Sequence, residues 1–144
     1  KMEQNLWAIF GKDKYENFPV QIKEALLDMV FNKGTEIILQ NKDLLYRLKN
    51  DKYEAAINCF TNVKNAGGKE LSGLCLRRLF EISLAGKFDN GQYKASNLKT
   101  AQDLYDKGVA LLKKEYPTNY QNILVSYNAT VKSYFGDKIK TVSK

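Results

Sequence analysis

The sequence contains no histidine and only two cysteines, Cys59 and Cys75. Without histidine, the Ser-His-Asp triad, the Cys-His pair, zinc bound through imidazole and every other imidazole mechanism are excluded. Two cysteines are too few for a zinc site made of four thiolates. They could form one disulfide or remain two free thiols, and buried, reduced thiols are the expected state. Any catalysis would therefore depend on a carboxylate, a lysine, a tyrosine or a single thiol.

Long apolar runs are also missing. No segment approaches the roughly 18 consecutive apolar residues of a membrane span, so no span is predicted. The charged start of the chain, residues 1–5, is not followed by an apolar segment, so we recognise no secretory signal in it. The two prolines, Pro19 and Pro117, stand where helices would begin or end, which leaves the helices between them unbroken.

What the sequence does have is helical periodicity. Apolar residues recur at helical spacing along almost the whole chain, and no strand pattern exceeds a few residues. One such stripe, formed by Ile22, Leu26 and Met29, ends at Gly34. The segment from about 69 to 85 is apolar almost all round, which is typical of a helix at the centre of a domain. The 144 residues therefore predict a single all-α domain of six to seven helices around that buried central helix.

The chain is basic. Lys and Arg number 23 and Asp and Glu 16, which gives a net charge of +7. The lysines are spread over nearly every expected helix, which indicates either a general attraction to polyanions or simply a solvated surface. No expected helix gathers Arg, Asn and Gln on one compact face, so specific recognition of nucleic acid is not predicted.

Two polar residues occupy positions that call for an explanation. Asn32 lies at the end of an apolar helix, just before Gly34. It is either a simple C-terminal cap or a hydrogen-bonding group at the lip of a cleft, able to bind an amide or a sugar hydroxyl. Arg78 falls among apolar positions such as Leu74 and Ile82. Because a guanidinium cannot be left unpaired in a dry core, Arg78 must reach a carboxylate or a solvent-filled cleft.

Three successive motifs resemble the C-terminal lobe of the phage-type lysozymes. The first two are the apolar helix Ala25–Gly34 and the short helix followed by an Ala-Ala helix in Leu44–Ala56. The third, Asn65–Arg78, is very similar to the family motif Ala-Gly-Gly-Lys-x-Leu-Pro-Gly-Leu-x-x-Arg-Arg, although Ser72 replaces the proline. The third motif is fairly specific, because its length, its glycines and its arginines all agree.

The resemblance implies a division of the chain and a source for the catalytic acid. Residues 1–87 would form a lysozyme-like C-terminal lobe, and residues 88–144 a helical extension packed on it. In the family, the acid is a glutamate of the N-terminal lobe, followed by Asp or Cys and then Thr at short fixed spacings. Glu115 and Thr130 match the ends of that pattern, but Leu124 occupies its middle. The catalytic glutamate motif is therefore not found in this chain.

The family also has an arginine that pairs across the cleft with the catalytic glutamate. The resemblance assigns this role to Arg78 or, less readily, to Arg77, which would favour the ionised form of that glutamate. The alternative for Arg78 is an internal pair with Glu81 or Glu70.

The resemblance favours a peptidoglycan-acting muramidase domain, the substrate-binding lobe of a bacteriolytic glycoside hydrolase such as a phage endolysin or secreted effector. It implies no metal and no organic cofactor. Its partners would be peptidoglycan glycan strands and an N-terminal catalytic lobe, and it would act after secretion or delivery to the bacterial periplasm or cell wall. The expected substrate-binding residues are Asn32, Lys69, Arg77 and Arg78. The alternatives are a non-catalytic module that binds wall glycan or a protein, and an enzyme that uses Glu36 as its acid.

Overall fold

The computed structural model describes residues 2–62, 65–66, 69–89 and 91–143. The first half contains α1 (Met2–Phe10), α2 (Lys12–Glu16), α3 (Val20–Lys33), α4 (Glu36–Gln40), α5 (Lys42–Lys49), α6 (Tyr53–Cys59) and the 3-10 turn η1 (Phe60–Asn62). The second half contains β1 (Asn65–Ala66), β2 (Lys69–Glu70), α7 (Ser72–Ala85), β3 (Lys87–Asp89), β4 (Gln92–Tyr93), α8 (Ala95–Glu115), α9 (Tyr120–Phe135) and η2 (Gly136–Lys138).

The all-α fold class is confirmed, with more helices than the sequence pattern predicts. The described residues form nine α-helices and two short antiparallel hairpins, β1–β2 and β3–β4. One extra helix arises because residues 12–16, whose polar composition predicts a connection, form α2. Gly11, with a φ of 89°, adopts a conformation that glycine tolerates best and separates α1 from α2.

The predicted central helix begins later than expected. Lys69 and Glu70 belong to β2 and pair with Ala66 and Asn65 of β1, so the backbone at 69–70 is extended. Leu71 is still extended, and α7 starts only at Ser72. The apolar pattern from 69 to 85 therefore includes a short strand followed by a helix.

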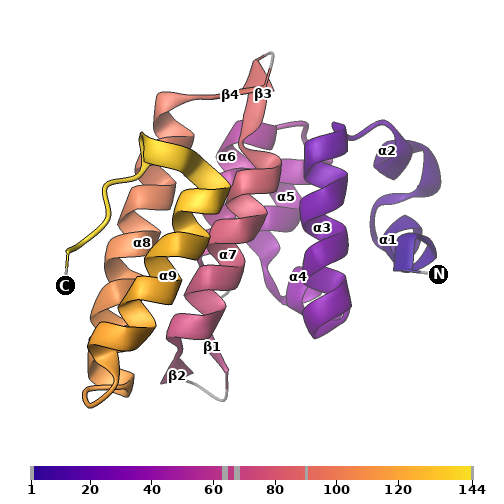
Figure 1. Ribbon diagram of the computed structural model, residues 1–144. Helices are drawn as coiled ribbons and strands as arrows, with labels where there is room; N and C mark the ends of the chain where they lie inside the picture. The colour runs from indigo at the N-terminus through magenta and orange to yellow at the C-terminus, as the bar shows by residue number, and fades with distance from the viewer. Residues whose placement is uncertain (1, 63–64, 67–68, 90, 144) are drawn as a thin grey trace.

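The helix α7 nevertheless lies at the centre of the molecule. Figure 1 shows α3 on one side of α7 and the antiparallel pair α8 and α9 on the other, with α1 and α2 beyond α3. Leu79 and Ile82 of α7 are fully buried, as is the predicted α3 stripe of Ile22, Leu26 and Met29.

The last two helices are joined to α7 through its N-terminus. The Glu115 carboxylate, at the end of α8, accepts hydrogen bonds from the Ser72 backbone N–H (3.1 Å) and from the Ser72 hydroxyl (2.6 Å). A carboxylate at this place satisfies a free N–H and favourably meets the positive end of the helix dipole. The tail after α9 folds back, with Ile139 buried and the Val142 N–H donating to the Tyr105 hydroxyl at 2.8 Å.

Candidate functional site

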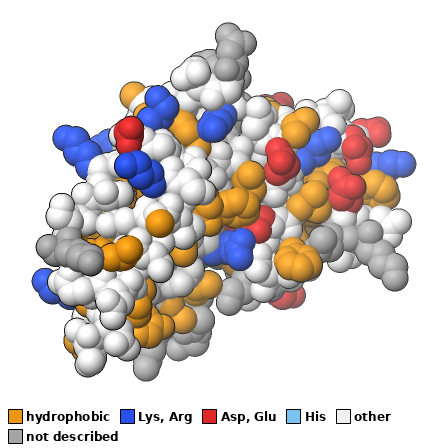
Figure 2. All heavy atoms as spheres, in the orientation of Figure 1, with side chains coloured by type: hydrophobic (Ala, Val, Ile, Leu, Met, Phe, Trp, Pro, Cys, Tyr) orange, Lys and Arg blue, Asp and Glu red, His pale blue; other side chains and the backbone are white. Residues whose placement is uncertain are grey.

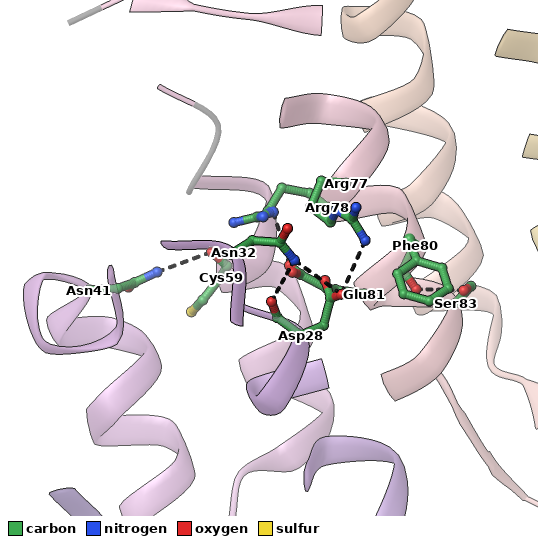
Figure 3. Close-up of polar contacts among 9 residues, drawn as sticks. All are labelled: Asp28, Asn32, Asn41, Cys59, Arg77, Arg78, Phe80, Glu81 and Ser83. Carbon is green, nitrogen blue, oxygen red and sulfur yellow. Dashed lines mark hydrogen bonds and ion pairs between the residues drawn. The ribbon is translucent and has the colours of Figure 1, made fainter. Parts of the chain in front are cut away.

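The candidate site is centred on Asp28, in the C-terminal half of α3. Its Oδ1 accepts hydrogen bonds from Arg77 Nη1 of α7 (3.1 Å) and from Asn32 Nδ2 (3.3 Å). Asn32 Nδ2 also donates to the Asp28 carbonyl oxygen at 2.8 Å. Figure 3 shows how α3 and α7 bring these three side chains together. We call them the Asp28–Asn32–Arg77 cluster.

This cluster lies at the surface of the α3–α7 contact. Asn32 is exposed and the Arg77 side chain is 41% exposed, whereas the Asp28 side chain is only 14% exposed. The Arg77 guanidinium also lies 5.6 Å from the centre of the Phe80 ring, in a cation–π arrangement. A largely buried carboxylate thus holds an amide and a guanidinium that remain accessible to a ligand.

The Arg78 side chain is buried in the core and is not exposed beside Arg77. Its side chain and that of Glu81 are both fully buried, and the two form an ion pair with Nε 2.9 Å from Oε1. Of the two possibilities that the sequence left open, the structure shows Arg78 reaching a carboxylate of its own helix. The side chain of Glu70, the other possible partner, lies outside the described residues.

The buried Glu81 carboxyl is electrostatically unusual. Burial raises its pKa above the ordinary value of 4.5, and the adjacent Asp28 carboxyl raises the pKa further, while Arg78 opposes both effects. Burial also lowers the pKa of Arg78. A guanidinium nevertheless keeps its proton in proteins, so Arg78 stays charged.

The remaining predicted site residues are not part of the cluster. The side chain of Lys69 lies outside the described residues, and only its backbone is placed, in β2. Glu36 is the first residue of α4 and is exposed. Within the described part of the chain, the Glu36 side chain makes no ion pair or hydrogen bond.

Sequence reasoning missed Asp28, the residue that links Asn32 to Arg77. A signal for it was present, because Asp28 stands four residues before Asn32 and interrupts an otherwise apolar helix. Residues four apart share one face of a helix, so the spacing of Asp28 and Asn32 favours contact between their side chains.

The described residues offer neither a metal site nor a membrane span beside the cluster. They contain no group of three or more His, Cys, Asp or Glu side chains placed to hold a metal ion. Nor do they include a helix long and apolar enough to span a membrane. Both cysteines are buried and neither is in a disulfide.

Comparison with known proteins gives one family. Residues 12–81 match the phage lysozyme family model. The match supports a relationship to the phage-type lysozymes, covers about half of the chain and includes the Asp28–Asn32–Arg77 cluster. Searches of curated proteins and of solved structures found no significant match.

Proposed function

We propose that this chain is a peptidoglycan-binding lobe of a lysozyme-type glycoside hydrolase, and that it binds glycan strands at the Asp28–Asn32–Arg77 cluster. The lysozyme family implies peptidoglycan as the substrate. The observation that carries the proposal is the position of the cluster: it lies within the family match and presents accessible polar groups from two helices.

The chemistry of these groups suits a glycan. Asn32 Nδ2 donates to Asp28, which leaves the Asn32 Oδ1 to accept from the N–H of an N-acetyl group or from a sugar hydroxyl. Arg77 offers several N–H donors in a planar fork, which suits the carboxylates of peptidoglycan. The bond from Arg77 to Asp28 fixes the guanidinium before the ligand arrives, which reduces the entropy lost on binding.

The cluster does not by itself provide the chemistry of hydrolysis. Cleavage of a glycosidic bond ordinarily needs one protonated carboxyl and a second carboxylate on either side of that bond. Glu115, whose spacing to Thr130 partly follows the family pattern, accepts hydrogen bonds from Ser72 at the start of α7. We therefore expect this chain to bind glycan and to hydrolyse it slowly or not at all, with the catalytic glutamate supplied by an N-terminal lobe.

The positive charge would assist binding in a general way. On the face seen in Figure 2, Lys and Arg side chains are scattered among acidic, apolar and neutral groups. With a net charge of +7, the chain is attracted to anionic wall polymers over the screening length of about 8–10 Å at physiological salt. Action at the cell wall would require secretion or delivery to that compartment.

The binding test is co-sedimentation with purified, insoluble peptidoglycan. Arg77→Ala should weaken binding about tenfold, because it removes a charged hydrogen-bond donor from the site. Lys132→Ala removes the same charge from an exposed position on α9 and is the matched control, with binding close to that of the unmodified protein. Equal binding by both variants would show that only overall charge matters and would refute the assigned site.

The activity test measures release of reducing sugars by the chain alone. We expect little release, and we expect addition of an N-terminal lobe with the family's glutamate motif to restore it. Strong hydrolysis by the chain alone would contradict this proposal. Glu36→Gln would then identify whether the exposed Glu36 is the acid.

A further inference from the structure

We propose that Glu81 and Asp28 hold one proton between them, with Glu81 donating to Asp28 Oδ2, and that Glu81 is thereby a positioning residue for Asn32 and Arg77. The proton itself can be tested without glycan. Only its consequence for binding rests on the proposed function.

The enclosed charges around Glu81 balance only if one of the two carboxyls carries a proton. Arg78 and Glu81 are fully buried and Asp28 is 14% exposed, so one cation is enclosed with two carboxyls. The second cation, Arg77, is 41% exposed, so water screens its charge. Arg77 therefore offsets the charge of a buried carboxylate only weakly. One proton on the two carboxyls makes the enclosed set neutral, and this avoids the large cost of an unpaired buried charge.

The buried oxygens of Asp28 and Glu81 lack hydrogen-bond donors in the described part of the chain. Asp28 Oδ1 accepts from both Asn32 and Arg77, whereas Oδ2 is buried and accepts no N–H or O–H from another described residue. Neither Glu81 oxygen accepts a well-aligned hydrogen bond from the described residues, although Arg78 Nε is close. The two carboxyls lie next to each other in Figure 3 and interact electrostatically. A hydrogen bond between two carboxyls requires a proton on one of them, and it satisfies Oδ2.

The surroundings of the two carboxyls indicate that Glu81 carries the proton. Asp28 is partly exposed and already accepts two hydrogen bonds, both of which favour its ionised form. Glu81 is fully buried, and burial favours its neutral form. Glu81 is therefore the donor, and Asp28 is the acceptor that keeps its charge for Arg77.

The consequence reaches the surface through Asp28. While the proton is present, the Glu81 hydroxyl donates to Asp28 Oδ2 and fixes the Asp28 carboxylate. Asp28 Oδ1 can then accept from Asn32 and Arg77 and hold both side chains in place. Loss of the proton places two carboxylates in contact, and their repulsion displaces Asp28 together with the two side chains that bind it.

The charged neighbours of Glu81 act in both directions: Asp28 raises its pKa and the two arginines lower it, while burial, the largest cause, decides the rise. Asp28 comes from α3 and Arg77 and Arg78 from α7, while Tyr134 of α9 interacts electrostatically with Arg77 and Asp28. In the part of the chain that the structure describes, α8, η1 and β3 contribute no charged group to this set. The folded protein keeps the proton to a higher pH than the unfolded chain does. The stabilisation is therefore complete below the ordinary pKa of 4.5 and is lost as pH rises towards the raised folded value.

The direct test is a carbon-13 NMR titration of the glutamate side-chain carboxyls in the unmodified protein. Glu81→Gln identifies the Glu81 signal, and Glu24→Gln, at an exposed position, is the matched control. We expect the Glu81 carboxyl to keep the chemical shift of the protonated acid at about pH 7, and Glu24→Gln to leave that signal unchanged. An ionised Glu81 at neutral pH would overturn the shared proton, whatever the protein binds.

The positioning role has its own test. Glu81→Gln keeps an N–H donor towards Asp28 Oδ2, so it should fold and bind peptidoglycan within about twofold of the unmodified protein at about pH 6. Binding by the unmodified protein should weaken about threefold or more between about pH 7 and pH 10.5, across the raised Glu81 pKa of about 10, and the Gln variant should fall less. An equal fall in both proteins would refute the positioning role, even if Glu81 is protonated. Failure of both to bind at any pH would instead refute the proposed function.

Discussion

The two sides of α7 are built from different chemistry. Towards α3, the contact contains Asp28, Arg77, Arg78 and Glu81, a cluster of ionisable side chains that is partly or wholly buried. Towards α8 and α9, the contact is made by small and aromatic groups: Cys75 lies close to Gly108, and the Phe80 and Tyr134 rings lie 5.1 Å apart.

The charged contact and the apolar contact of α7 contribute differently to the stability of the domain. Enclosed charges add little net stability, because desolvation offsets most of their attraction. Close apolar packing adds stability directly. We infer that apolar packing on both sides of α7 stabilises the domain, while the α3 side also holds a polar site.

The largest expected effect concerns the packing of α7 itself. Leu79→Ala should lower the free energy of unfolding by about 2–5 kcal/mol, because Leu79 is fully buried and its loss leaves a cavity. Leu74 lies on the same helix but is only partly buried, and Leu74→Ala should cost less. Urea unfolding of both variants provides the measurement. Equal losses at the two positions would contradict the packing of α7.

A smaller effect is expected where α8 meets α9. A Cβ added at Gly108 would overlap the Tyr127 hydroxyl and lie 3.2 Å from Cys75 Cβ, so Gly108→Ala should cost about 1–3 kcal/mol. Tyr127→Phe should restore much of that loss, because it removes the hydroxyl that the new methyl group meets. The double-mutant cycle is measured by thermal or urea unfolding. Additive effects of the two changes would show that this contact does not set the cost.

The smallest stability effect is expected at the hydrogen bonds between Glu115 of α8 and Ser72 at the start of α7. Glu115→Ala should cost about 1 kcal/mol, since it removes the acceptor for Ser72 at the N-terminus of α7. Glu24→Ala, at an exposed position on α3, should change stability by less than about 0.5 kcal/mol. A loss at Glu115 no larger than at Glu24 would argue against our proposal that residues 88–144 pack on the lobe formed by residues 1–87.

The parts of the fold that were predictable from sequence are those fixed by local periodicity. The α3 stripe and the central position of α7 follow from apolar spacing, and both are confirmed. The start of α7 was not predictable in this way, because Lys69 and Glu70 pair with a strand instead of joining the helix. Tertiary pairing overrides a local apolar pattern at such a position.

Phe31 shows that apolar character alone does not determine whether a side chain is buried. Its apolar character predicts a place in the core around α7, yet the residue is 73% exposed. Met29 occupies the buried face of α3, and a residue two positions later points about 200° away around the helix. The apolar character of Phe31 does not indicate its exposure, whereas its position around the α3 helix does.

The candidate site was predictable only in part. Asn32 stood out because an amide ends an apolar helix, and Arg77 stood out through the family motif. Which of two adjacent arginines turns outward depends on the side on which α3 packs, and the sequence pattern does not determine that side. The role of Glu81 depends on its burial next to Asp28, a contact between two helices far apart in the chain.

The most direct test of the glycan site is an NMR titration of the nitrogen-15 labelled protein with a soluble peptidoglycan fragment. If the α3 side of α7 binds glycan, the amide signals that shift will belong to residues 28–32 and to the neighbourhood of Arg77. The amides of α9 should then remain unchanged. Shifts confined to α8 and α9, or no shifts at fragment concentrations that saturate other glycan-binding domains, would contradict the assignment of the site to the Asp28–Asn32–Arg77 cluster.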